Sequence, residues 1–191
     1  MEVVKLTPQQ IYRKQEAGDP VQPGEAPDVR RHIITVLLEN HSGALNRVIN
    51  MFSQRGFNLE SVTVGQTDDP SVSRLTLVTT GNNRVIKQVN RQLNNLIDAL
   101  EVDDLTTAEY VERELCLLKV KYDAETRPQL INTNDIFEGN VVDITHSTMT
   151  FQVVGPTKKI NAFIALMEPH GIEEVARSGR LAMRRALIHG D

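Results

Sequence analysis

One order of predicted elements occurs twice along the chain, and this repeat constrains the fold more than any other feature. In each half, a strand, a helix, two strands joined by a turn, a second helix and a last strand follow one another. The order first covers residues 31–106 and then residues 110–180. A split βαβ arrangement, with helices on one face of a sheet, accommodates this order. The pattern therefore predicts the α+β class, with two ferredoxin-like βαββαβ domains in tandem.

The first domain is predicted from the spacing of its apolar residues. Residues 32–39 are a nearly unbroken run of β-forming residues, which indicates a buried strand. From Ala44 onward, apolar residues recur every three or four positions, which indicates a helix with one buried face. Ser42 is the expected N-cap of this helix, and Gly56 is its expected stop. The other expected elements are strands at residues 59–67, 75–80 and 99–105 and a helix at residues 85–96.

The second domain repeats the order after a break in the pattern near residues 106–108. Pro128 is compatible with a first helical turn, and Thr157 is the expected cap of the last helix. Residues 1–30 form an N-terminal extension with a helix expected at residues 8–16, and residues 181–191 form a tail in which we expect a short basic helix. The expected elements of the domain are strands at residues 114–121, 140–145, 150–154 and 172–177 and helices at residues 125–137 and 157–167.

Composition restricts the class of protein. The 191 residues are 40% hydrophobic and 24% charged, as in a globular chain, and the net charge of −4 argues against a nucleic-acid-binding protein. No run approaches the ~18 apolar residues of a membrane span, and residues 1–30 lack the apolar core of a signal peptide. We therefore expect a cytoplasmic protein that binds neither nucleic acid nor membranes. The single cysteine, Cys116, lies in an apolar run and is expected to be a buried structural thiol.

No arrangement of titratable residues in the sequence indicates an enzyme. The five histidines are scattered, and no two of them have the i, i+4 spacing of a helical metal site. Residues 68–70, Asp-Asp-Pro, are typical of a hairpin turn, and no glycine-rich phosphate loop occurs. We therefore predict no catalytic residue, no metal ligand and no cofactor in this chain.

The loop Asn40-His41-Ser42-Gly43, between the first strand and the first helix, has the features of a binding site. The first N–H groups of a helix have no internal partners and favour an anion. Because Gly43 has no side chain, a ligand carboxylate could approach the N–H groups of Gly43, Ala44 and Leu45. Asn40 offers both a carbonyl and an amide group.

A second part of the predicted site begins the next strand. Asn58 offers another polar group there, and Leu45 and Leu59 would contact an apolar side chain. Together these residues suit a zwitterionic aliphatic amino acid. The same loop is also typical of a plain turn with an N-cap, so spacing alone leaves both interpretations open.

Five stretches of the sequence together resemble one family of proteins. They are residues 36–45 (VLLENHSGAL), 52–61 (FSQRGFNLES), 67–70 (TDDP), 111–114 (VERE) and 175–179 (VARSG). Through them the chain is similar, from residue 31 to residue 179, to the small regulatory subunits of acetolactate synthase, which is also called acetohydroxyacid synthase. Residues 1–30 depart from the short N-terminus that is usual in bacterial members.

The resemblance implies an N-terminal ACT domain and a C-terminal ACT-like domain. It implies that two copies pair through their ACT domains and bind valine, or another branched-chain amino acid, at their interface. Residues 40–45 would hold the ligand from one copy, and Asn58 with Leu59 would reach it from the other. It further implies a separate catalytic subunit that carries thiamine diphosphate, magnesium and FAD. The small subunit would activate this partner and make it sensitive to feedback inhibition.

Two other classes of protein share the predicted fold. An amino-acid-sensing transcription regulator would need a helix-turn-helix or a strongly basic face, and the sequence predicts neither. An acylphosphatase-like hydrolase would need an arginine-bearing phosphate loop where this chain has residues 40–43. For contact with a catalytic subunit, the strand at residues 115–120 and the basic tail with Arg184 and Arg185 are candidates.

Overall fold

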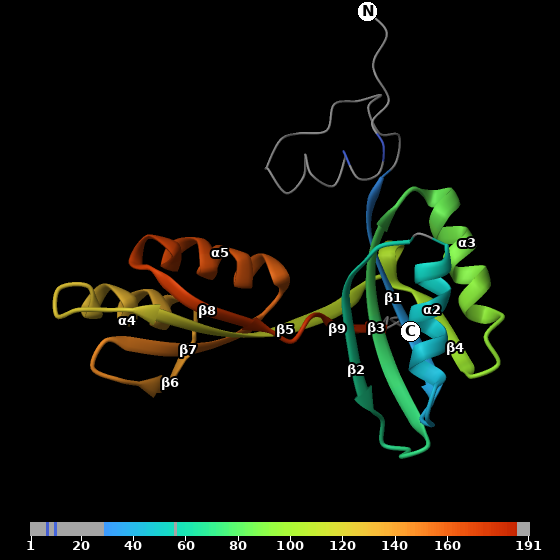
Figure 1. The fold of residues 1–191 in the computed structure, drawn as a ribbon, viewed down its shortest axis with the longest axis horizontal. Helices are drawn as coiled ribbons and strands as arrows, with labels where there is room; N and C mark the ends of the chain where they lie inside the picture. The colour runs from blue at the N-terminus through green and yellow to red at the C-terminus, as the bar shows by residue number, and fades with distance from the viewer. Residues whose placement is uncertain (1–6, 8–9, 11–28, 56, 187–191) are drawn as a thin grey trace, which may run out of the picture. The chain divides into compact units, whose positions relative to one another are not determined.

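The computed structural model describes Thr7, Gln10, residues 29–55 and residues 57–186. The helix expected at residues 8–16, apart from Gln10, and the helix stop expected at Gly56 lie outside the described residues. The chain divides between Ala108 and Glu109 into two compact units, and each contains strands and helices in the predicted order (Figure 1). The predicted α+β class with two tandem ferredoxin-like domains is confirmed.

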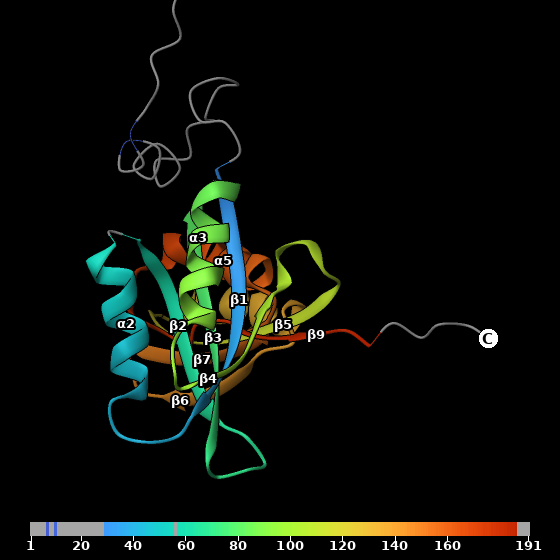
Figure 2. The same ribbon diagram turned by 90° about the vertical axis from the view of Figure 1, so that its right-hand side faces the viewer.

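The first unit is a four-stranded antiparallel sheet with two helices on one face (Figure 2). The order across the sheet is β2-β3-β1-β4, so the first strand is central and pairs with the third and the fourth. A 3₁₀ turn, Leu105–Thr107, follows the last strand. The elements are β1 (Arg30–Glu39), α2 (Ala44–Gln54), β2 (Leu59–Gln66), β3 (Val72–Gly81), α3 (Asn83–Asn94) and β4 (Ala99–Asp104).

The core of this unit lies between the sheet and the two helices. Alternate residues of β1 and β3 point into it, as the period of two in a strand requires. The helices contribute residues spaced three or four apart, so each buries one apolar face. This packing fixes both β1 and α2, and with them the loop that joins the two. The core residues are Ile34, Val36, Leu38, Ala44, Val48, Met51, Phe52, Leu75, Leu77, Val89 and Leu93.

The second unit has the same strand order, β6-β7-β5-β8, and one additional strand. Its elements are β5 (Tyr110–Lys121), α4 (Arg127–Ile136), β6 (Asn140–Ile144), β7 (Thr148–Gly155), α5 (Thr157–Met167), a 3₁₀ turn (Glu168–His170), β8 (Ile172–Arg177) and β9 (Leu181–Arg184). Cys116 is completely buried in the core of this unit, and burial raises the pKa of its thiol. The prediction of a buried structural thiol is therefore confirmed.

Two predicted helix starts are wrong by one residue. The N-cap of α2 is Gly43, not Ser42, and no side chain caps this helix. Gly43 takes φ 93° and ψ −16°, a left-handed conformation that glycine adopts without strain and serine does not. At α5 the N-cap is Pro156, and Thr157 is the first helical residue. The hydroxyl of Thr157 donates to the carboxylate of Glu114 at 3.1 Å, so it serves a tertiary contact instead of the cap.

The expected basic helix in the tail is also wrong. Residues Leu181–Arg184 form strand β9, which pairs antiparallel with the first four residues of β5. Ala182 is 1% exposed, whereas its neighbours Leu181 and Met183 are 53% and 60% exposed. This alternation has the period of a strand, and the free edge at the start of β5 provides the backbone partners.

Candidate functional site

The loop of residues 40–43 joins the end of β1 to the start of α2. A Cβ atom placed on Gly43 would have no other atom within 4 Å, so open space adjoins the helix start. The N-terminal N–H groups of a helix point outward along its axis and lack partners within the helix. The conformation of Gly43 therefore leaves room for an anionic group beside the first turn of α2.

Asn40 connects this loop to the β2–β3 turn. Its backbone N–H donates to the carbonyl of Ser71 at 2.7 Å, and its side-chain Nδ2 donates to the carbonyl of Pro70 at 2.9 Å. The side-chain carbonyl oxygen and the second N–H of the amide are therefore the groups that Asn40 can offer to a ligand. A shallow depression of about 290 Å³ lies here, lined by Glu39, Asn40, His41, Ser71, Val72 and Leu100.

An ion-pair cluster lies beside the same loop. The Asp98 side chain, from the turn before β4, is 3% exposed, and both its oxygens accept from Nη1 of Arg47 at 2.5 Å. One of them also faces Nε2 of His41 at 3.1 Å. Burial opposes the ionisation of Asp98, but these hydrogen bonds and positive charges outweigh it, so the pKa of Asp98 lies below its ordinary value.

His41 is the residue of the loop that faces this cluster. Its Nδ1 faces the carbonyl of Ser42 at 3.0 Å, and its Nε2 also lies 3.4 Å from a carboxylate oxygen of Glu39. The Ser42 carbonyl, followed by the Asp98 and Glu39 carboxylates, raises the pKa of His41, although partial desolvation opposes this. The cluster therefore favours a positively charged imidazole next to the start of α2.

Glu39, His41 and Asp98 bring potential metal-ligand atoms within 4.8 Å of one another. However, the guanidinium of Arg47 donates to both oxygens of Asp98, and a cation bound there would have to displace it. The donor set thus fits a network of ion pairs better than a metal centre.

Gly43 precedes α2, whereas Asn58 and Leu59 follow it at the start of β2. The start of β2 lies near the C-terminal end of α2 (Figure 2). The 11 residues of this helix span roughly 16 Å at 1.5 Å per residue. Asn58 is exposed and Leu59 half-buried, and the backbone carbonyl of Asn58 accepts from the Thr79 hydroxyl at 2.5 Å. One chain therefore brings residues 40–45 together, with Leu45 38% exposed on α2, but does not bring Asn58 and Leu59 to them.

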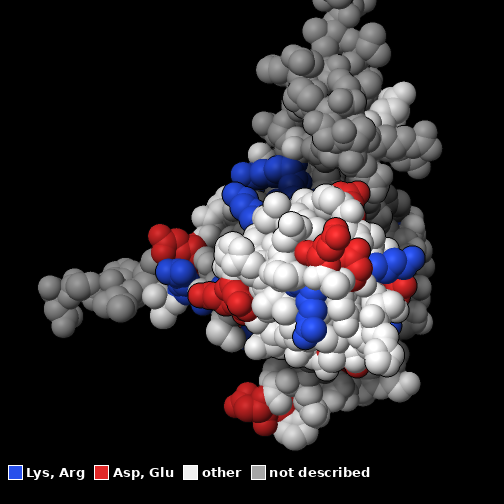
Figure 3. All heavy atoms as spheres, turned by 90° about the vertical axis from the view of Figure 1, so that its left-hand side faces the viewer, with Lys and Arg blue, Asp and Glu red and all other residues white. Residues whose placement is uncertain are grey.

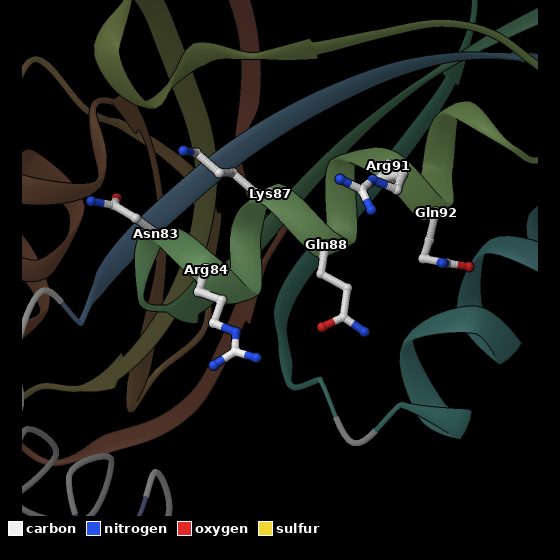
Figure 4. Close-up of a pocket in the computed structure, with 6 residues that line it drawn as sticks. All are labelled: Asn83, Arg84, Lys87, Gln88, Arg91 and Gln92. Atoms are coloured by element: carbon white, nitrogen blue, oxygen red, sulfur yellow. The ribbon is translucent and has the colours of Figure 1, made fainter.

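A second depression, of about 570 Å³, lies on the outer face of α3 (Figure 4). This helix carries Arg84, Lys87 and Arg91 but no acidic residue, although the chain as a whole is negatively charged. The three cations have no ion pair within the described part of the chain. They can attract an anionic group. The sequence analysis did not predict this surface, although the spacing of the three cations, three and four residues apart, could have indicated it. The lining residues are Asn83, Arg84, Lys87, Gln88, Arg91 and Gln92.

On the side of α4 and β6, the second unit presents separate acidic and basic groups among uncharged residues (Figure 3). Every residue of β6 is exposed, and Val141, Val142 and Ile144 are 43%, 49% and 49% exposed. In the strand expected at residues 115–120, Cys116, Leu118 and Val120 point into the core, whereas Leu115 and Leu117 are each 36% exposed. Exposed apolar side chains that lie together on a surface are typical of contacts with other proteins.

Asp98 and Arg47 were not predicted as site residues. The contact between His41 and Asp98 joins residues 57 positions apart in the sequence, so no local pattern connects them. The one available signal was that Asp98 is a single acid between the apolar pairs 96–97 and 99–100. An acidic residue in such a run is buried only when it has partners.

The fold and the loop define the class of protein. A βαββαβ domain with an open, left-handed glycine at the start of its first helix has the architecture of an ACT-type domain, and a second domain of the same topology follows it here. No helix in the described part of the chain is both long and apolar enough to cross a membrane.

Comparison with known families specifies this class further. Residues 34–101 match the AHAS small subunit-like ACT domain, and residues 113–186 match the small subunit of acetolactate synthase. The chain is 45% identical over 156 residues to the acetolactate synthase isozyme 3 small subunit of Escherichia coli, covering 81% of this chain and 96% of that protein. It is 43% identical over 155 residues to a probable acetolactate synthase small subunit of Methanothermobacter thermautotrophicus, covering 81% and 92% respectively.

A solved structure agrees with these relatives. The crystal structure of the acetolactate synthase small subunit from Thermotoga maritima is 33% identical and superposes with a TM-score of 0.77, covering 83% of this chain and 99% of that one. The chain therefore belongs to the family of acetolactate synthase small subunits. The resemblance predicted from sequence is confirmed, and the chain is a regulatory small subunit.

Proposed function

We propose that this chain activates a catalytic acetolactate synthase subunit and confers feedback inhibition by a branched-chain amino acid. The observation that carries the proposal is the open left-handed Gly43 at the start of α2, next to Asn40. The N–H of Ala44 donates to the carbonyl of His41 at 3.3 Å, so we assign the anion cradle for the carboxylate of the amino acid to the N–H groups of Gly43 and Leu45. The exposed Leu45 provides an apolar contact for its side chain.

The site is proposed to be completed by a second copy of the chain. Gly43 precedes α2, which is roughly 16 Å long, and Asn58 and Leu59 follow it, so we do not expect a single chain to place both groups on one small ligand. In a symmetric pair, the same two surfaces meet twice, so each of two sites would take residues 40–45 from one copy and Asn58 with Leu59 from the other. This arrangement supports a homodimer formed through the ACT domains, which span residues 31–106.

The resemblance to the family supports a division of labour between two subunits. In this proposal the catalytic subunit carries thiamine diphosphate, magnesium and FAD, and the small subunit holds the effector in the same cytoplasmic complex. The amino acid inhibits only if it binds more tightly to the less active state of the complex than to the more active state. The free energy of coupling between an effector site and an active site is typically ~1–3 kcal/mol. The exposed apolar residues of β6 in the second unit are a candidate contact for the catalytic subunit.

Reconstitution tests the proposal. The full chain is mixed with a thiamine-dependent catalytic subunit from the same source, and acetolactate formation is titrated with valine, leucine and isoleucine. We expect the small subunit to raise the activity and at least one of the three amino acids to lower it again. A catalytic rate that is unchanged by the chain, or insensitive to all three amino acids, would contradict the proposal.

A further inference from the structure

The buried carboxylate of Asp98, in the turn before β4, contacts the proposed effector loop of residues 40–43. The carboxylate of Asp98 contacts Arg47 of α2 and His41 of the loop, and the backbone carbonyl of Asp98 accepts from the N–H of Glu39 at 2.9 Å. Asp98 therefore connects the end of β1, the loop and the first turns of α2 through a single residue of the α3–β4 turn. The side chains of Arg47 and His41 are about half exposed, at 50% and 43%, whereas that of Asp98 is buried.

The geometry around His41 specifies its protonation state. Both ring nitrogens face oxygen atoms, Nδ1 the carbonyl of Ser42 and Nε2 the carboxylate of Asp98. A neutral imidazole has only one N–H group, so it can donate to only one of these acceptors. The imidazolium donates to both. The contacts of the loop are therefore complete only when His41 carries a proton.

The charges that face His41 from the surrounding elements are balanced only in that state. Glu39 at the end of β1 and Asp98 in the α3–β4 turn are negative, and Arg47 on α2 is positive. With His41 protonated the four groups sum to zero, and with His41 neutral they sum to one negative charge. A ligand carboxylate at the start of α2 would be repelled by the second arrangement and not by the first.

We propose that Asp98 is a positioning residue of the effector site, which holds the His41 imidazolium beside the helix start so that the effector carboxylate and the proton on His41 bind cooperatively. The inference rests on the proposed function, because it concerns the same loop. By linkage, a bound carboxylate raises the pKa of His41, and binding takes up protons from solution. Affinity for the effector should then fall as the pH rises through the pKa of His41.

Calorimetric titration of the full chain with valine, leucine and isoleucine tests this inference. It is carried out from about pH 6 to pH 9, the range around a raised histidine pKa, in buffers of different ionisation enthalpy, which report proton uptake. For the wild type we expect proton uptake and weaker binding at high pH. Asp98→Asn should bind roughly tenfold more weakly at the low end of the range, equivalent to about 1.4 kcal/mol, and lose most of the proton uptake.

Glu114→Gln is the matched control. Glu114 is also a buried carboxylate that accepts both bonds from one arginine, Arg177, but it lies in the second unit. This variant should bind the effector with the affinity and the pH dependence of the wild type. If it loses affinity as much as Asp98→Asn does, the effect of Asp98 is general destabilisation and the inference fails.

A second variant keeps the inference testable if Asp98→Asn does not fold. Arg47→Met retains the apolar stem of the side chain and removes its charge. Because Arg47 repels a charged His41 and competes for Asp98, NMR titration of the His41 ring should show a higher pKa in Arg47→Met and, where it folds, a lower pKa in Asp98→Asn. Unchanged His41 titration in Arg47→Met would overturn the inference.

The outcomes separate this inference from the proposed function. A wild-type chain that binds none of the three amino acids would contradict the proposed function itself. A wild-type chain that binds one of them without proton uptake, together with equal binding by Asp98→Asn, would leave the proposed function intact and refute only the role of Asp98.

Discussion

At the scale of single residues, Gly43 and Asp98 determine the proposed site in different ways. Gly43 acts by what it lacks, since its left-handed backbone and missing side chain leave space at the start of α2. Asp98 acts through its contacts, which hold a loop histidine and a helix arginine. Gly43 was identified from sequence because a glycine at a strand-to-helix junction is a local signal. Asp98 was not, because its partners are distant in the sequence.

Gly43→Asp should abolish inhibition of the reconstituted enzyme by the amino acid while leaving activation intact. The new carboxylate would occupy the open space beside the helix start and repel the carboxylate of the effector. The measurement is the acetolactate synthase rate with and without the effector.

Gly171→Asp provides the control, because Gly171 also has a positive φ, 86°, and an added Cβ would make only ordinary contacts there. Both variants adopt a left-handed conformation that costs roughly 1–2 kcal/mol for residues other than glycine. Inhibition of Gly43→Asp to the same extent as the wild type would show that residue 43 does not adjoin the effector.

At the scale of elements, the long helices and central strands were predictable and the short strand β9 was not. The apolar residues of α2 recur over 11 residues, which is enough to define a period, and the run of β1 indicates a strand buried within a sheet. Strand β9 has four residues, so its alternation cannot be distinguished from a turn of helix. Its conformation is determined by pairing with the edge of β5. Val111 pairs with Met183, 72 positions later in the sequence, and local patterns do not report contacts over such a separation.

Ala182→Glu should separate β9 from β5. Ala182 is 1% exposed, so a carboxylate at this position would have to be buried without a partner or the strand would have to detach. We expect faster amide hydrogen exchange at residues 110–113 and a loss of about 1–3 kcal/mol in the free energy of unfolding. Exchange as slow as in the wild type at these amides would contradict the pairing.

The ion pair between β5 and β8 predicts a pH dependence of stability. Burial opposes ionisation of Glu114, but the hydrogen bonds and charge of Arg177 outweigh it and lower the pKa of Glu114. A carboxyl with a lowered folded-state pKa contributes stability above its unfolded pKa of about 4.3, and this contribution is lost as the pH falls through the lower, folded-state pKa.

Glu114→Gln should therefore lower the free energy of unfolding at pH 7 and flatten its decline in acid. We expect a loss of about 2–3 kcal/mol, less than the roughly 3–5 kcal/mol of a fully buried pair, because Arg177 keeps partial access to water. Urea unfolding at a series of pH values measures both effects. Parallel pH profiles for the variant and the wild type would contradict this role of the pair.

At the scale of the whole molecule, the repeat in the sequence predicted both domains and the likeness to a family predicted the class of ligand. The boundary between the compact units, after Ala108, falls where the hydrophobic pattern lapses. Whether the site is shared between two copies could not be predicted from spacing, because Asn58 and Gly43 are only 15 positions apart in sequence and the intervening helix separates them. The length of α2 in the structure supports the proposal of a second copy.

A mixing experiment tests the shared site most directly. Asn40→Ala and Asn58→Ala are prepared as separate full-length chains, and each alone should bind valine, or whichever branched-chain amino acid the wild type binds, ~1.5–3 kcal/mol more weakly. In a mixed dimer, one site carries both substitutions and the other carries neither. After the two variants are exchanged in equal amounts, about a quarter of all sites should therefore regain wild-type affinity in calorimetry, as an isologous pair requires. A mixture that binds no more tightly than the two separate variants would contradict a site shared between copies.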